Sequence, residues 1–204
     1  MRRLPKWQWT PLELLRFHGL MRPMPTTTRK EQDRWTEIAA DPVLQDLPYK
    51  VETNARGQPI LSPHANRHSR LQKALLNLLD CHAPEGESFP EYALATSQGI
   101  KVPDAVWMSP GRAAAMQDTG DPSTLAPEIC VEVLSESNTV EEMSGKHVLH
   151  RETGAEEVWI VDHDGRIQFF REEEIKTSEI APACPPRVWR SGRSELSSDR
   201  GIAV

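Results

Sequence analysis

Three residues of this sequence have side chains and a spacing that suit metal-assisted hydrolysis. Asp104 lies in "VPDAVW", Glu132 in "EICVEVLS", and Lys146 follows Glu132 by fourteen residues. Two carboxylates from adjacent strands can hold a divalent metal ion, and a lysine can meet an attacking water or the charge that develops on a phosphate. Each residue also has an ordinary structural explanation, which for Lys146 is a surface ion pair with Glu142 four residues earlier.

Glu132 is the least expected of the three, because Ile129, Val131 and Val133 alternate around it as in a buried strand. An ionised carboxylate inside a protein costs several kcal/mol unless a cation, a metal or hydrogen-bond donors meet it. Either the strand lies at the edge of a sheet and water solvates Glu132, or a cation is expected beside it. This stretch alone leaves both explanations open.

The residues after Glu132 predict a strand, a helix and a second strand. "SESNTVEEMSGKHVLHRETG" predicts a helix that Asn138 caps, with Glu141 three residues later and Gly154 at its end. "AEEVWIVD" then predicts a strand, with "RIQFFRE" as its hairpin partner across "HDG". A βαβ unit of this kind places the Glu132 strand and the "VWIV" strand in one sheet, in parallel.

Upstream, the sequence predicts a hairpin, a long helix and further strands. "YKVET" and "QPILS" flank the turn "NARG", and leucines at helical spacing predict the longest helix within residues 62–83. On that helix His68 and Gln72 lie four residues apart and can approach the site, although a histidine at a polar helix start is more often solvated or capping. Strands are expected in "FPEYALAT" and "GIKVPDAVWMS", and a surface loop in "GRAAAMQDTGDPSTL".

We expect one α/β domain with an extension at each end. Residues 1–45 predict an N-terminal helical extension, with helices in "TPLELLRFHG" and "TTRKEQDRWTEIAADP". Residues 46–171 form the domain that carries the candidate site. Residues 172–204 are polar and irregular, with room for one further strand before a loose tail.

Composition narrows the class of protein. The net charge of −6 over 204 residues argues against a broad basic surface, so any nucleic-acid contact must be local or metal-assisted. Three scattered cysteines without a Cys-x-x-Cys pair support neither a disulfide framework nor a zinc knuckle. No apolar run approaches the roughly 20 residues of a membrane span, and the basic start lacks the apolar centre of a secretory signal, so we expect a cytoplasmic protein without membrane contact.

Small-molecule hydrolysis finds little support in the sequence, which contains no Gly-x-Ser-x-Gly elbow, P-loop or dinucleotide fingerprint. Instead, "VPDAVWMS", "EICVEVLSES", the lysine fourteen residues after Glu132 and "GAEEVWIVD" resemble the Uma family of putative restriction endonucleases. The related PD-(D/E)XK nuclease superfamily usually keeps its lysine two residues after the second acid, where this chain has Leu134. The Uma family resembles that superfamily with the lysine moved to the following helix.

The similarity covers residues 35–171 and includes "DPVLQDLPYKVETNARGQPILSPHANRHSRLQ". His150 stands where members of the family usually have a tyrosine. The resemblance implies a restriction-endonuclease-like fold, in which helices flank a mixed β-sheet. It also implies a Mg²⁺-dependent endonuclease that hydrolyses DNA phosphodiesters, with Mn²⁺ able to substitute.

By residue, the resemblance implies that Asp104 and Glu132 hold the metal, with the backbone carbonyl of Val133 as a further ligand. Lys146 would orient or activate the water. Glu52 matches the acid of the family's opening strand and is a further candidate for the metal site, against the alternative of a hairpin surface acid.

Two functions remain open on the sequence. The first is the metal-dependent endonuclease, with DNA as its substrate; cutting both strands of a duplex with one site per chain favours a homodimer. The second is a catalytically inactive nuclease-fold protein that binds nucleic acid or a protein partner.

Overall fold

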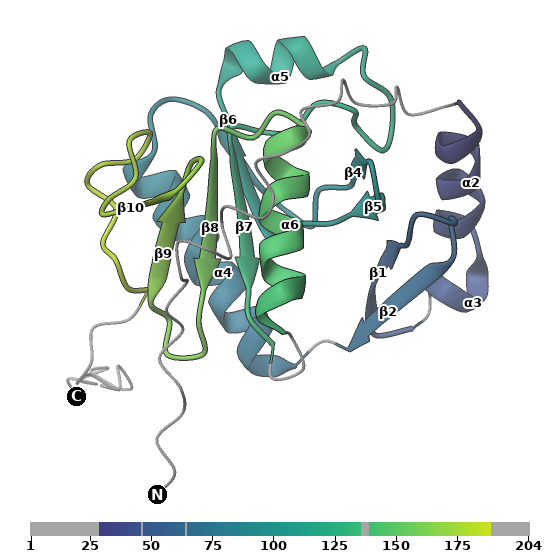
Figure 1. Ribbon diagram of the computed structural model, residues 1–204, viewed down its shortest axis with the longest axis horizontal. Helices are drawn as coiled ribbons and strands as arrows, with labels where there is room; N and C mark the ends of the chain where they lie inside the picture. The colour runs from purple at the N-terminus through teal and green to yellow at the C-terminus, as the bar shows by residue number, and fades with distance from the viewer. Residues whose placement is uncertain (1–28, 46, 64, 136–138, 189–204) are drawn as a thin grey trace, which may run out of the picture.

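A six-stranded mixed sheet forms the centre of the computed structural model, which describes residues 29–45, 47–63, 65–135 and 139–188 (Figure 1). The strand order is β10-β9-β8-β7-β6-β3. Strands β7 and β8 are parallel, and every other neighbouring pair in this sheet is antiparallel. The six strands are β3 (Glu87–Pro90), β6 (Ala105–Met108), β7 (Ile129–Val133), β8 (Glu157–Val161), β9 (Ile167–Phe170) and β10 (Glu174–Ile175).

Helix α6 (Val140–Glu152) connects β7 to β8, so the predicted βαβ unit and its parallel pairing are confirmed. The helix begins with a capping box in which Thr139 Oγ1 accepts the N–H of Glu142 and the Glu142 carboxylate accepts the N–H of Thr139. The predicted cap at Asn138 was therefore one residue early, and Asn138 itself lies outside the described residues. Gly154 ends the helix with a φ of 108°, which glycine adopts without strain.

The two faces of β7 are buried beneath different helices. Helix α4 (Asn66–His82), the long helix expected from its leucines, packs Leu71, Leu75 and Leu79 against Val131 and the aromatic rings of the sheet. Helix α6 covers the other face, and Figure 1 shows α6 in front of the sheet and α4 behind it. Because strand side chains alternate, Glu132 faces away from the Val131 side, toward α6.

Two small hairpins lie beside α6 and form sheets of their own (Figure 1). One consists of β1 (Tyr49–Thr53) and β2 (Pro59–Pro63), as the sequence predicts, and the other of β4 (Leu94–Thr96) and β5 (Gly99–Lys101). The hairpins meet at Gly99, where a Cβ atom would lie 2.3 Å from the carbonyl oxygen of Asn54. This close approach requires glycine and brings β1 against β5.

Helices α2 (Arg29–Ala39) and α3 (Pro42–Gln45) pack beyond these hairpins. Helix α2 confirms the helix predicted before Pro42, whereas the one expected in "TPLELLRFHG" lies outside the described residues. Gln32 anchors α2 by donating to the carbonyl oxygens of Thr119 and Pro122. None of the helices in the described ranges is long and apolar enough to cross a membrane.

Three local predictions need correction or refinement. The surface loop expected after β6 begins with α5 (Pro110–Met116), because Ser109 caps the helix and Pro110 fits its first turn. The strand expected in "FPEYALAT" is divided between β3 and β4, since Glu91 adopts a positive φ of 50° between them. The strand expected in "GIKVPDAVWMS" is divided between β5 and β6, with Asp104 directly before β6.

After β9, the chain adds β10 to the sheet edge and places Ala181 and Cys184 in the core beside α4. All three cysteines are free thiols, as their spacing indicates. The division of the chain at residues 45 and 171 stays a prediction.

Candidate active site

Asp104 is held by contacts from three elements. Its Oδ1 atom lies 2.6 Å from Lys50 Nζ of β1 and 3.1 Å from His68 Nε2 of α4. Its Oδ2 atom accepts the N–H of Val133 at 2.7 Å, and Gln72 donates to its backbone carbonyl at 2.8 Å. Asp104 is therefore fixed with Oδ2 bonded to the central sheet and Oδ1 facing the cations.

Glu132 lies in an interior strand, because β7 is paired with β6 on one side and β8 on the other. The explanation that places Glu132 on an edge strand is thus wrong. Its Oε1 atom lies 2.8 Å from His150 Nε2, and its Oε2 atom lies 3.1 Å from Lys146 Nζ and 4.0 Å from Lys50 Nζ. The ammonium groups of Lys146 and Lys50 meet this buried carboxylate at Oε2, and His150 meets it at Oε1.

Lys146 points from α6 into the same cluster. Its ammonium lies 2.9 Å from Glu52 Oε1 in addition to its contact with Glu132. Its partners are thus the carboxylates of the site, while Glu142 closes the helix cap. Glu52 is buried on β1 and also accepts the N–H of Val102 at 3.0 Å, so it is not a hairpin surface acid.

The structure brings all seven candidates from the sequence to one place. Val133 and His68 contact Asp104, Lys146 joins Glu132 to Glu52, and Gln72 supports the backbone of Asp104 from α4. A small cavity of about 60 Å³ opens onto this cluster. It is lined by Lys50, Ser62, Pro63, His68, Asp104, Glu132, Val133, Ser135 and Lys146.

Sequence reasoning missed Lys50, His150 and Lys101. Lys50 is two residues before Glu52 in β1, a spacing that places both side chains on one face of the strand. His150 is four residues after Lys146 in α6, a spacing that makes them neighbours on one helix face. These two spacings are the signals that point to Lys50 and His150. Lys101 donates to the carbonyl oxygen of Thr53 at 2.8 Å and lies at the margin of the cluster.

The lysines decide the charge state of the two acids. Burial alone would raise the pKa of Asp104, but Lys50 and then His68 outweigh it and bring the pKa below its usual range. Burial likewise opposes ionisation of Glu132, and Lys146 and Lys50 hold its pKa below the usual value. Burial would lower the pKa of Lys146, but Glu132 and Glu52 raise it above the normal lysine value. Both acids and Lys146 are therefore charged at neutral pH.

Asp104 and Glu132 have the chemistry and the arrangement of ligands for a divalent cation. Within the described residues, no group of three or more His, Cys, Asp or Glu side chains is arranged to hold a metal ion. Asp104 Oδ1 and Glu132 Oε2 nevertheless face one cation, because Lys50 Nζ lies 2.6 Å from the former and 4.0 Å from the latter. Mg²⁺ commonly uses only one or two carboxylates and keeps several waters. The pair of acids fits such an ion.

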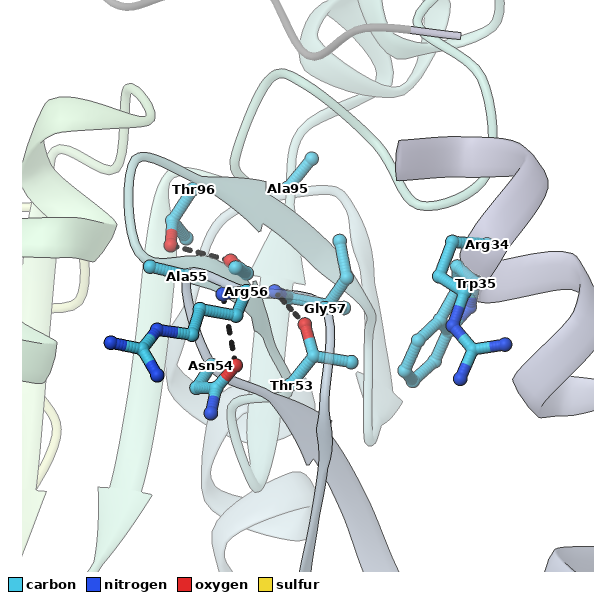
Figure 2. Close-up of a pocket in the computed structure, with 11 residues that line it drawn as sticks. Arg34, Trp35, Thr53, Asn54, Ala55, Arg56, Gly57, Ala95 and Thr96 are labelled. Carbon is cyan, nitrogen blue, oxygen red and sulfur yellow. Dashed lines mark hydrogen bonds between the residues drawn. The ribbon is translucent and has the colours of Figure 1, made fainter. Parts of the chain in front are cut away.

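A second, larger cavity of about 400 Å³ lies between α2 and the two small hairpins (Figure 2). Trp35 on α2 faces the β1–β2 turn across it, and Arg34 and Arg56 extend on opposite sides. Thr53 and Ile100 line this cavity. Thr53 directly follows Glu52 in the chain, and Ile100 directly precedes Lys101, so the cavity lies next to the cluster in sequence. None of the described residues that line it is acidic, so this cavity is separate from the carboxylate cluster.

The fold is shared with a protein of known structure. The crystal structure of a putative nuclease belonging to DUF820 from Anabaena variabilis ATCC 29413 matches this structure with a TM-score of 0.54 at 15% sequence identity. The match covers 68% of this chain and 87% of that one. It confirms the mixed sheet with flanking helices that the sequence predicts.

Comparison of the sequence with models of protein families identifies the family of this chain. The model of the family Uma2, described as "Putative restriction endonuclease", matches residues 26–192, which is well over half of the chain. The chain belongs to the Uma2 family, and the resemblance seen in the sequence is confirmed. A restriction-endonuclease-like nuclease is the class of protein that this family and this fold support. No significant match was found among curated proteins.

Proposed function

We propose that this protein is an endonuclease that hydrolyses DNA phosphodiester bonds with the help of a divalent metal ion, Mg²⁺ or in its place Mn²⁺. The observation that carries the proposal is the convergence of Asp104, Glu132 and Lys146. The two acids reach one buried position from neighbouring strands, and the Lys146 ammonium lies 3.1 Å from Glu132 Oε2. Acids alone would repel an anionic substrate, so the site needs a cation to accept one.

Each metal-binding acid uses one oxygen for support and keeps the other for the cation. Asp104 Oδ2 is bonded to the N–H of Val133, which leaves Oδ1 toward Lys50. Glu132 Oε1 is bonded to His150, which leaves Oε2 toward Lys146 and Lys50. Outer hydrogen bonds of this kind fix the direction of a metal ligand. The carbonyl of Val133, a residue that lines the cavity, is the further ligand we propose.

A bound Mg²⁺ ion would lower the pKa of a water and screen the phosphate oxygens. Lys146 would act there as a cation, since its ammonium contacts the carboxylates of Glu132 and Glu52. An ammonium has three donors, of which Glu52 and Glu132 take two. The third can orient the attacking water or meet the charge that develops on the phosphate.

Glu52 and His68 support this site from either side. Glu52 holds Lys146 while its own carboxylate is fixed by the N–H of Val102. His68 lines the cavity beside Asp104, and its hydrogen bond to Asp104, the largest influence, raises its pKa above the usual value. Glu52 thus positions the lysine, and His68 adds positive charge where a phosphate would enter.

Cleavage of supercoiled plasmid and of single-stranded and duplex oligonucleotides tests the proposal, in EDTA and with Mg²⁺ or Mn²⁺. We expect nicking or linearisation only with the metal ions, and none by Asp104→Asn. Glu141→Gln removes an exposed acid at the start of α6 and should cleave as the parent does. A parent protein that binds Mn²⁺ and DNA but cuts no substrate would contradict hydrolysis and favour the binding module.

With DNA as substrate we also expect a homodimer, because one site per chain cuts one strand. Sedimentation of the protein with and without duplex DNA measures this directly. A monomer on duplex DNA that still makes double-strand breaks would contradict the dimer.

A further inference from the structure

Lys50 is the most enclosed cation of the cluster. It is 8% exposed, and three carboxylates lie within 4.0 Å of its ammonium nitrogen. The contacts are 2.6 Å to Asp104 Oδ1, 4.0 Å to Glu132 Oε2 and 4.0 Å to Glu52 Oε1. No part of the nuclease mechanism above assigns a role to this lysine.

The oxygens that face Lys50 are the ones turned toward the cations of the cluster, since Lys146 also reaches Glu132 Oε2 and His68 reaches Asp104 Oδ1. Val133 holds the other oxygen of Asp104, and His150 holds the other oxygen of Glu132. A divalent ion shared by the two acids would need these same two oxygens at about 2.0 to 2.6 Å. The Lys50 ammonium, 2.6 Å from Asp104 Oδ1 and 4.0 Å from Glu132 Oε2, faces both of these oxygens, as an ion shared by the two acids would.

We propose that Lys50 is a resident cation, which occupies the metal position between Asp104 and Glu132 and must be displaced when the ion binds. This inference rests on the proposed function, because it takes these two acids as the metal ligands. The resident ammonium neutralises the buried acids in the ion-free protein. It also makes the affinity for the ion lower than the two carboxylates alone would give.

The place of Lys50 in the fold allows such an exchange. Its strand belongs to the separate β1–β2 hairpin and not to the six-stranded sheet that carries Glu132. All five residues of β2, the partner strand, are exposed. A lysine side chain is long and flexible, so the ammonium can leave while the backbone stays paired. Glu52 on the same strand keeps its contacts with Val102 and Lys146.

Lys101 provides a matched control for the effect of charge alone. It is a buried lysine of the same cluster, but its ammonium donates to the carbonyl of Thr53 and forms no ion pair within the described residues. Removal of Lys50 takes away both charge and occupancy, whereas removal of Lys101 takes away charge only. If Lys50 occupies the metal position, the two substitutions have unequal effects on the ion.

The test is calorimetric titration of the full chain with Mn²⁺ at pH 7, together with thermal unfolding in EDTA and in Mn²⁺. Lys50→Ala should bind Mn²⁺ at least about 10-fold more tightly than the parent, and Lys101→Ala less than about 3-fold more tightly. Lys50→Arg keeps the cation and should bind no more tightly than the parent. The midpoint of unfolding of Lys50→Ala should fall in EDTA and rise more with Mn²⁺ than that of the parent.

Unchanged or weaker Mn²⁺ affinity in Lys50→Ala overturns the proposal, as does an equal gain in Lys101→Ala. Lys50→Met, which keeps most of the stem, replaces the alanine variant if the latter does not fold. If the parent cleaves DNA and Lys50→Ala binds Mn²⁺ no more tightly than the parent, the role of Lys50 as a resident cation is contradicted. The proposed nuclease activity is then still supported. A gain in affinity without cleavage by any variant supports the resident cation and contradicts hydrolysis. Absence of Mn²⁺ binding in every variant overturns both.

Discussion

His150 Nε2 lies 2.8 Å from Glu132 Oε1, and the imidazole is completely buried beneath α6. An ionised carboxylate oxygen can only accept, so Nε2 donates this hydrogen bond. Nδ1 is the one buried side-chain nitrogen or oxygen without a hydrogen-bond partner in the described part of the chain. The functional contact of His150 is therefore its donation to Glu132.

This contact explains how the site accommodates a departure from its family. The resemblance described for the sequence implies a tyrosine at this position, and a tyrosine hydroxyl is also a donor. We expect His150→Tyr to keep Mn²⁺ affinity near that of the parent, and His150→Phe to lose about 10- to 100-fold because Glu132 becomes free to turn. Calorimetry with Mn²⁺ measures both. Equal affinities in the phenylalanine variant and the parent would show that the donor has no role in orienting Glu132.

Glu132→Gln should abolish Mn²⁺ binding and also lower stability. An all-acid site would gain stability from the loss of one repelling charge, but Glu132 lies between Lys146 and Lys50. Removing one partner of a buried ion pair costs about 3 to 5 kcal/mol because the remaining charges are uncompensated. Urea unfolding in EDTA measures the loss. A variant as stable as the parent would mean that the lysines find other partners.

The site consists of one half formed by β7, α6 and β8 and another formed by β1, and the sequence predicts the first half better than the second. The β7–α6–β8 half could be predicted because its period, capping residues and Gly154 all indicate the same local structure, and Lys146 then faces β7. In the β1 half the hairpin and Glu52 could be predicted, but the burial of Lys50 could not, since a lysine in a short hairpin strand has the pattern of a solvated residue. Its burial comes from contacts with Asp104, 54 residues away, that no local pattern encodes.

The same distinction between local and distant signals accounts for the incorrect predictions at α5 and between β3 and β4. Helix α5 has a local signal, since Ser109, Pro110 and the alanines that follow favour a helix start, and that signal was outweighed by the Gly, Asp and Ser residues around it. The division between β3 and β4 depends on the positive φ of Glu91, which is unusual for glutamate and has no sequence signature.

His147 predicts a pH dependence that is separate from the metal site. It is buried against Phe170, its Nε2 lies 2.8 Å from the carbonyl oxygen of Arg171, and burial lowers its pKa to about 4. The unfolded chain binds a proton near pH 6.5 and the folded protein only near pH 4, so stability is lost as pH falls through this window. The share of His147 is at most on the order of 3 kcal/mol.

His147→Gln keeps a donor for the Arg171 carbonyl and should remove most of this loss. Urea unfolding in EDTA at intervals between pH 7 and pH 4.5 compares the slopes of the two proteins. His163→Gln, in the β8–β9 turn, serves as the control and should keep the slope of the parent. Parallel stability curves for His147→Gln and the parent would contradict the assignment.

Lys146→Ala should separate catalysis from metal binding. The ammonium contacts Glu132 and Glu52, and its removal takes no ligand from the ion, so Mn²⁺ affinity should stay equal to that of the parent or rise. Cleavage should slow by about 10²-fold or more, because the lysine acts on the water and on the charge of the transition state. Single-turnover cleavage at saturating Mn²⁺ measures the chemical step, and Lys176→Ala removes an exposed charge beside β10 as a control. If Lys146→Ala cleaves as fast as the parent, the lysine only neutralises the two glutamates, and another group must act on the water.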